Sequence, residues 1–138
     1  MDACPTGAIV EEGVVDARRC ISYHTIENRG DIPEGAGRRM GAWVFGCDIC
    51  QEVCPWNRKP PVSDEPDFEP RPGQAAPDLA ALAQLDEAAF RARFSGSPLM
   101  RAKHAGMVRN ARIALQNMEQ TEPGRREFFD YTAPKPIR

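Results

Sequence analysis

The cysteines are the residues of this 138-residue chain whose type and spacing indicate chemistry. Three of them, Cys47, Cys50 and Cys54, lie in the stretch GCDICQEVCPWNR, separated by two and three residues and followed by a proline. Runs of the form Cys-x2-Cys-x2-Cys-x3-Cys-Pro bind 4Fe-4S clusters, and their fourth cysteine binds the neighbouring cluster. The stretch reproduces the last three thiols of such a run, and Cys4, which also precedes a proline, corresponds to the end of another.

The fifth thiol, Cys20, and its distance from the later cysteines depart from that run. If Cys54 binds a neighbouring cluster, four thiols remain as the complete ligand set of one 4Fe-4S cluster: Cys4, Cys20, Cys47 and Cys50. A four-thiolate zinc site is the alternative, because zinc also accepts a Cys-x2-Cys pair with distant partners. The two Cys-Pro pairs favour a 4Fe-4S cluster over a zinc site.

Composition is that of an ordinary globular chain, with 41% hydrophobic residues and a net charge of −2. We expect one compact domain, or a small domain with an appended subdomain. An uninterrupted apolar window of about 18 residues and a basic-then-apolar start are both absent from the sequence, so we expect a cytoplasmic protein without a membrane partner. An odd number of cysteines in a reducing compartment favours metal or redox chemistry over disulfides.

We expect an α+β fold. The sequence divides into four parts, of which the first carries the thiols. Residues 1–58 form a small ferredoxin-like 4Fe-4S segment, in which AIVEEGVVD predicts a two-stranded ribbon turning at Glu12-Gly13. Little of this segment is apolar, so bound metal is expected to contribute to its folding. Residues 59–77 form a proline-rich linker, 78–120 a helical subdomain, and 121–138 an irregular tail.

Capping residues and apolar periodicity predict the helices of 78–120. Asp78 and Asp86 are expected N-caps of two short helices, the second with Phe90 and Phe94 on one face. A longer helix is expected to begin after Ser97, at a first-turn proline. Its predicted apolar stripe holds Met100, His104, Met107, Ala111, Ala114, Leu115 and Met118.

The last third of the chain is basic, with ten Lys and Arg against four Asp and Glu from residue 91 onwards. Four cations with Asn110 suit contacts to RNA phosphates: Arg101, Lys103, Arg109 and Arg112. A solvated basic helix face accounts for the same charges. We expect Trp43 and Trp56 to fill a small core, and His24 and His104 to pack without binding metal.

Three stretches carry a resemblance that goes beyond cysteine spacing: ACPTGAI, DARRCISYHTIENRG and MGAWVFGCDICQEVCPWNR. Together they resemble the iron–sulfur region of the epoxyqueuosine reductase family. The later FSGSPLMRAKHAGMVRNARIALQN resembles the segment that follows it, so the likeness covers roughly residues 3–118. These enzymes reduce the epoxide of epoxyqueuosine at the wobble position of the tRNA anticodon, the last step of queuosine biosynthesis. They use a cobalamin and two 4Fe-4S clusters.

The resemblance implies roles for individual residues. Four thiols resemble the ligands of the cluster nearer the cobalamin: Cys4, Cys20, Cys47 and Cys50. Cys54 resembles the fourth ligand of the other cluster. Ser22 and Asp48, with Cys47, are implied to lie in the vicinity of the cobalamin, and Arg29 is implied to face the tRNA. A catalytic acid is assigned to no residue of this sequence, because in the family it belongs to another domain.

In the family, three more cysteines and a cobalamin-binding catalytic domain precede the position of Cys4. We therefore expect a C-terminal fragment of an epoxyqueuosine reductase, either truncated or mis-started, or a subunit that joins a separately encoded N-terminal part. It would pass electrons from an external donor through 4Fe-4S to cobalamin, and alone it is expected to be inactive. The alternatives are a stand-alone one-cluster ferredoxin-like electron carrier and a zinc-stabilised binding module.

Overall fold

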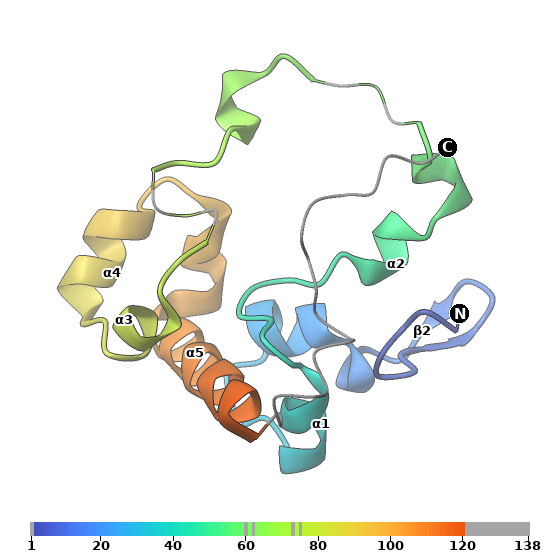
Figure 1. Ribbon diagram of the computed structural model, residues 1–138, viewed down its shortest axis with the longest axis horizontal. Helices are drawn as coiled ribbons and strands as arrows, with labels where there is room; N and C mark the ends of the chain where they lie inside the picture. The colour runs from blue at the N-terminus through green and yellow to red at the C-terminus, as the bar shows by residue number, and fades with distance from the viewer. Residues whose placement is uncertain (1, 60, 62, 73, 75, 121–138) are drawn as a thin grey trace.

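The structure is a computed structural model that describes residues 2–59, 61, 63–72, 74 and 76–120. In chain order its elements are β1 (Ile9–Glu11), β2 (Val14–Val15), η1 (Ala17–Arg19), η2 (Tyr23–Glu27), α1 (Glu34–Arg39), α2 (Ile49–Glu52), η3 (Pro55–Asn57), η4 (Pro66–Phe68), α3 (Leu79–Ala83), α4 (Glu87–Phe94), η5 (Pro98–Ala102) and α5 (Lys103–Gln120). Helices α3, α4 and α5 lie together, and β2 and α2 lie on the opposite side of the molecule (Figure 1). The predicted α+β class is confirmed.

A short β-ribbon follows the first cysteine. Strands β1 and β2 are antiparallel, with Ile9 opposite Val15 and an irregularity in register before Glu11. Gly13 lies in the connecting turn with a φ of +73°, a conformation that glycine adopts without a Cβ clash. The predicted turn at Glu12-Gly13 is therefore confirmed.

A single π-helical turn, η2, follows the second cysteine. The amide of Asn28 donates to the carbonyl of Tyr23 at 2.9 Å, the five-residue spacing that defines such a turn. Its residues His24 and Thr25 are buried, with 4% and 1% of their surface exposed. This turn brings the chain that follows Cys20 into the interior.

The proline-rich stretch between the two groups of elements arches from the end of α2 to α3 (Figure 1). Its described residues form one 3-10 turn, η4, in which Phe68 is 76% exposed. Arg71 donates to the carbonyls of Ser95 and Gly96 at 2.7 and 3.0 Å, so this end of the connector is attached to the end of α4.

The helical part contains the main hydrophobic core. Asp78 accepts hydrogen bonds from the amides of Ala80 and Ala81, and Asp86 accepts one from the amide of Ala89, as the sequence predicted for N-caps. The buried cluster comprises Leu82, Ala83, Phe90, Phe94, Ala102, Met107 and Ala111. Helix α5 is thereby held firmly against α3 and α4.

The long helix begins later than predicted. Pro98–Ala102 form the 3-10 turn η5, and α5 begins at Lys103, whose φ is +62°. Because a positive φ interrupts helical geometry, η5 and α5 are not continuous. Ser97 does not cap the turn through its side chain, since its hydroxyl donates to the carbonyl of Phe94. At the other end of the predicted stripe, Met118 is 57% exposed.

The expected core role of Trp56 is wrong, because its side chain is 90% exposed, whereas Trp43 is half-buried. Among the described residues before position 59, the buried hydrophobic side chains are Ala8, Ile21 and Met40. This part of the molecule has too little apolar interior to enclose a second indole. Residues 121–138, expected to be irregular, lie outside the described residues. Within the described chain, every helix is too short or too polar to cross a bilayer.

Candidate metal centre

Four thiols from three parts of the chain line one cavity of about 140 Å³: Cys4, Cys20, Cys47 and Cys50. Cys4 precedes β1, Cys20 lies between η1 and η2, Cys47 precedes α2, and Cys50 lies within α2. The apolar side chains of Ile9, Val15, Ile21 and Ile49 also line this cavity. The fold thus gathers the four thiols that the sequence singled out around one space.

The backbone around Cys4 is a tight turn directed at the sulfur. The Gly7 amide donates to the Cys4 carbonyl at 3.1 Å, and the Ala8 amide lies 3.3 Å from Cys4 Sγ. Burial opposes ionisation of this thiol, but the Thr6 hydroxyl and neighbouring amides together outweigh it and lower the pKa of Cys4 to about 7. The turn therefore favours the thiolate form, which is the form that binds metal.

Cys20 is positioned by the turns on either side of it. Asp16 caps η1 by accepting from the Arg18 amide at 3.1 Å, and the Cys20 amide donates to the Ala17 carbonyl at 3.0 Å. The side-chain hydrogen bond from Arg18 is the main cause that lowers the pKa of Asp16. Downstream, the His24 amide donates to the Cys20 carbonyl, which connects the cysteine to η2.

Cys47 and Cys50 are supplied by the start of α2. Gly46 precedes them with a φ of +75°, so a residue that tolerates this region is required there. Burial raises the pKa of Cys47, and the charges of the Cys50, Cys20 and Cys4 thiolates raise it further. Such repulsion between neighbouring thiolates would be relieved by a cationic metal centre.

Cys54 stands apart from this group. It is half-buried at the end of α2, where its amide donates to the Gln51 carbonyl at 3.2 Å. It is not among the described residues that line the cysteine cavity. In the part of the chain that the structure describes, no three His, Cys, Asp or Glu side chains are grouped tightly enough to bind one metal ion.

Ser22 and Asp48 lie next to the thiols. Ser22 is half-buried and lines the cysteine cavity, and its hydroxyl donates to the Cys47 carbonyl at 3.4 Å. Asp48 is exposed at the start of α2 and does not cap that helix through its side chain. Ser22 therefore joins two cysteine segments, whereas the Asp48 carboxylate faces solvent.

The predicted RNA-contact residues fall into two groups. Arg101, Lys103 and Arg112 are exposed, and Arg101 forms an ion pair with Glu27 at 2.6 Å. Arg29 is also exposed, but it donates to the carbonyls of Ile26 and Ala102. The exposed cations lie on η5 and α5 or beside them.

Arg109 and Asn110 are engaged inside the fold. Arg109 is half-buried and donates to the carbonyls of His24, Asn28 and Gly30, and burial lowers its pKa, with nearby Arg29 adding to the effect. Asn110 is completely buried. The expected phosphate contact of Asn110 is therefore wrong, because RNA cannot reach an enclosed amide.

Thr25, which the sequence did not indicate as a site residue, connects the cysteine segments. Its hydroxyl accepts from the Gly46 amide at 3.0 Å and donates to the Ile21 carbonyl at 2.8 Å. No spacing pattern marks this threonine, because its partner lies in a distant loop. The ring nitrogens of His24 and His104 lie within hydrogen-bond distance of the carbonyls of Arg18 and Leu85.

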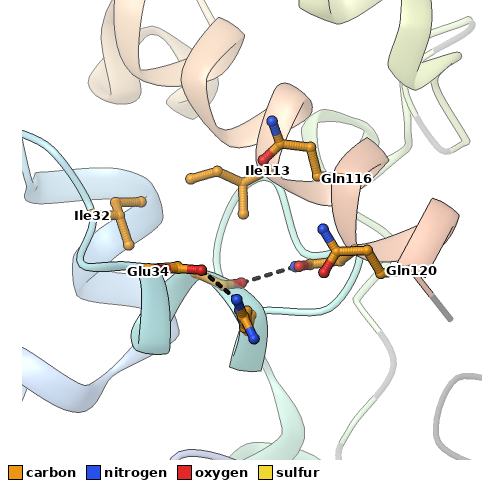
Figure 2. A pocket seen from close by; sticks show the side chains of 8 residues that line it. Ile32, Glu34, Ile113, Gln116 and Gln120 are labelled. Carbon is orange, nitrogen blue, oxygen red and sulfur yellow. Dashed lines mark hydrogen bonds and ion pairs between the residues drawn. The ribbon is translucent and has the colours of Figure 1, made fainter.

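A larger cavity of about 270 Å³ lies between α1 and α5. Figure 2 shows Ile113, Gln116 and Gln120 of α5 on one side and Ile32 and Glu34 on the other. Its lining contains amides, an ion pair between Glu34 and Arg38, and apolar side chains, but no thiol among the described residues. Size alone is a poor guide to function here, and the smaller cavity holds the reactive groups.

The sequence matches known proteins over most of its length. Residues 1–57 match a family model described as a 4Fe-4S double cluster binding domain. An epoxyqueuosine reductase from Synechocystis sp. is 48% identical over 118 residues, which are 84% of this chain and 41% of that protein. One from Salmonella typhimurium is 50% identical over 117 residues, which are 85% of this chain and 30% of that protein. The chain thus spans less than half of the length of these curated relatives.

The fold matches as well. A crystal structure of epoxyqueuosine reductase with an epoxyqueuosine-modified tRNA-Tyr stem loop superposes with a TM-score of 0.79 at 36% sequence identity. The superposition covers 86% of this chain and 31% of that chain. The similarity therefore includes both the cysteine segments and the helices that support them.

Proposed function

We propose a function for this chain as a member of the epoxyqueuosine reductase family, to which it belongs over the length that it shares with its relatives. It serves as the iron–sulfur part of such an enzyme, in the reduction of epoxyqueuosine to queuosine in tRNA. The observation that carries this proposal is the convergence of Cys4, Cys20, Cys47 and Cys50 on one cavity. These thiols are the ligands that we propose for one 4Fe-4S cluster.

The donor set fits a cluster better than a single ion. A zinc ion needs four thiolates at about 2.3 Å from one centre, which brings the four sulfurs close together. A cubic cluster binds each thiolate to a different iron, so its ligands stand further apart around a cavity. Four sulfurs bordering a cavity of about 140 Å³ support the second arrangement.

When bound, a 4Fe-4S cluster supplies one-electron transfer. Residues of this chain influence the reduction potential of the cluster and its exposure to water. The amide of Ala8 and the hydroxyl of Thr6 lie within hydrogen-bond reach of Cys4 Sγ, and such bonds to sulfur raise the reduction potential of a cluster. Ile21 and Ile49 line the cavity and limit the access of water, while exposed Cys50 marks the side open to solvent.

The finer assignments follow from the family. We propose that the cobalamin of the whole enzyme lies on the side of Ser22 and Asp48, where the exposed carboxylate of Asp48 is available to a neighbouring group. Cys54, which lies outside the cysteine cavity, is proposed as a ligand of a second cluster whose other thiols come from elsewhere. We do not expect this chain to catalyse the reaction alone. In our proposal the chain supplies the electron-transfer cluster, and the acid that protonates the epoxide oxygen belongs to another part of the enzyme.

The partner that we propose is tRNA. One of the superposed relatives contains a tRNA stem loop. In this chain Arg101, Lys103 and Arg112 are exposed cations on η5 and α5, with Arg29 close by. Exposed cations of this kind attract phosphates through the release of counterions.

The test is anaerobic purification of the chain, with iron, sulfide and zinc assayed on one sample together with the visible spectrum. We expect about four irons and four sulfides per chain and a brown protein, as one cubic cluster requires. About one zinc per colourless chain would instead support a zinc-stabilised module and overturn the redox role. The loaded chain alone should not reduce epoxyqueuosine tRNA, and turnover without a partner would contradict the division of labour proposed above.

A further inference from the structure

Asn110 has a fully buried side-chain amide on α5. Its hydrogen bonds reach two chain segments, the one that follows Cys20 and the one that precedes Cys47. Its Nδ2 donates to the Thr25 carbonyl at 2.8 Å and to the Val44 carbonyl at 2.9 Å. Thr25 lies shortly after Cys20, and Val44 shortly before Cys47. One side chain therefore bridges two loops that are otherwise far apart in the chain.

The neighbouring Arg109 fixes the orientation of that amide. Its Nε and Nη2 lie 3.1 and 2.9 Å from Asn110 Oδ1, so the oxygen faces the guanidinium and the nitrogen faces the two carbonyls. The same guanidinium donates to the His24 carbonyl at 2.7 Å and to the Asn28 carbonyl at 2.9 Å. Both ends of η2 are thereby attached to α5.

The network continues from these carbonyls to the cysteines. Thr25 Oγ1 accepts from the amide of Gly46, the residue immediately before Cys47. Ser22 Oγ donates to the carbonyl of Cys47 itself. Because α5 is anchored in the main hydrophobic core, it can act as a rigid template for loops that have little core of their own.

We propose that Asn110 is a positioning residue for the iron–sulfur site: by joining the Thr25 and Val44 carbonyls, it sets the separation of Cys20 and Cys47. It touches neither sulfur nor metal, and it acts through the backbone of the two loops. The inference rests on the proposed function, because it concerns the cluster that these thiols are proposed to bind.

The same helix offers a matched control. Asn117 Nδ2 also donates to two carbonyls, those of Gly37 and Gly41, at 2.8 and 2.9 Å. It joins α5 to α1 on the face shown in Figure 2, away from the cysteines. Asn110→Asp and Asn117→Asp therefore remove similar donors from the same helix. The first acts on Thr25 and Val44, close to Cys20 and Cys47, whereas the second acts on Gly37 and Gly41 at the α1 end, further along the chain from Cys47.

Three readouts on the cluster-loaded chain separate a positioning role from a merely structural one. They are the rate of cluster loss to an Fe(II) chelator, the electron paramagnetic resonance spectrum of the reduced cluster, and amide hydrogen exchange. We expect Asn110→Asp to lose its cluster about tenfold faster, as disturbing a partner of a ligand segment typically does. Its spectrum should shift, and exchange should rise at Gly46. Asn117→Asp should keep the spectrum and loss rate of the unmodified chain and show faster exchange in α1.

Thr25→Val gives a second, uncharged test in case a buried carboxylate prevents folding. It keeps the shape of the side chain and removes the hydroxyl that accepts from Gly46. It should also speed cluster loss. Equal loss rates in the Asn110 and Asn117 variants, or an unchanged rate in Thr25→Val, would overturn the inference and leave the proposed function standing. A chain that binds no iron or sulfide would overturn the proposed function, and the inference with it.

Discussion

The hydroxyl of Thr25 accepts a hydrogen bond from the amide of Gly46 at 3.0 Å, across 21 positions of the chain. Thr25 is 1% exposed and Gly46 is half-buried, so the hydroxyl end of this bond is enclosed by the protein. It holds the loop after Cys20 against the loop before Cys47. The position of two thiols therefore depends on a polar contact in the protein interior as well as on cysteine spacing.

Single Cys→Ser substitutions should divide the five cysteines into two classes. Replacing Cys4, Cys20, Cys47 or Cys50 removes a thiol that lines the cavity, so the anaerobically purified variant should lose most of its iron and its visible colour. Cys54→Ser is the control, because Cys54 does not line this cavity among the described residues. Iron assays and spectra are the measurements. Loss of colour in Cys54→Ser, with retention in Cys20→Ser, would contradict the assigned ligand set.

Removal of the metal should loosen one part of the molecule more than the other. Before position 59 the described buried hydrophobic residues are Ala8, Ile21 and Met40, whereas the larger cluster packs around α5. We therefore expect a bound metal centre to contribute folding free energy to the cysteine segments. Hydrogen exchange before and after treatment with chelator should rise strongly in residues 2–58 and little in α3, α4 and α5. A uniform rise over both parts would show that the helical part also depends on the metal.

The core around α4 should tolerate little truncation. Phe90 is 2% exposed and packs against Phe94, with ring centroids 5.3 Å apart. Phe90→Ala should lower the free energy of unfolding by about 3–5 kcal/mol, because it removes buried surface and leaves a cavity. Phe68→Ala is the matched control, since that ring is 76% exposed. Urea unfolding monitored by far-UV circular dichroism would show this difference, and equal losses in the two variants would be inconsistent with the described core.

The features that the sequence predicted are the local ones. The ribbon follows from Gly13, and the caps from Asp78 and Asp86, because each depends on a few adjacent residues. The gathering of the thiols around one cavity was expected from cysteine spacing and family resemblance together. Contacts between distant segments left no comparable signal. By sequence, Asn110 and the cations around it suit contacts to RNA phosphates, yet tertiary packing encloses the amide.

Trp56 shows the opposite error. A large aromatic side chain is expected to be buried for its hydrophobic area, but burial requires other apolar residues nearby. The described part of the chain around the cysteines provides few of them, and the indole remains 90% exposed. The type of a residue predicts whether its burial is favourable. It does not predict whether the surrounding segment has enough apolar side chains to enclose it.

The exposed and the internal cations should respond differently to substitution when RNA binding is measured. Arg112 is exposed on α5, so Arg112→Gln should weaken binding of a tRNA anticodon stem loop and reduce the slope of log affinity against log salt by about one. Arg91→Gln, on α4 and paired with Glu87, is the control and should leave the slope unchanged. Arg109→Gln should instead lower the melting temperature, because its guanidinium bonds carbonyls within the fold. A salt slope unaffected by Arg112→Gln would remove this face of α5 from the proposed RNA contact.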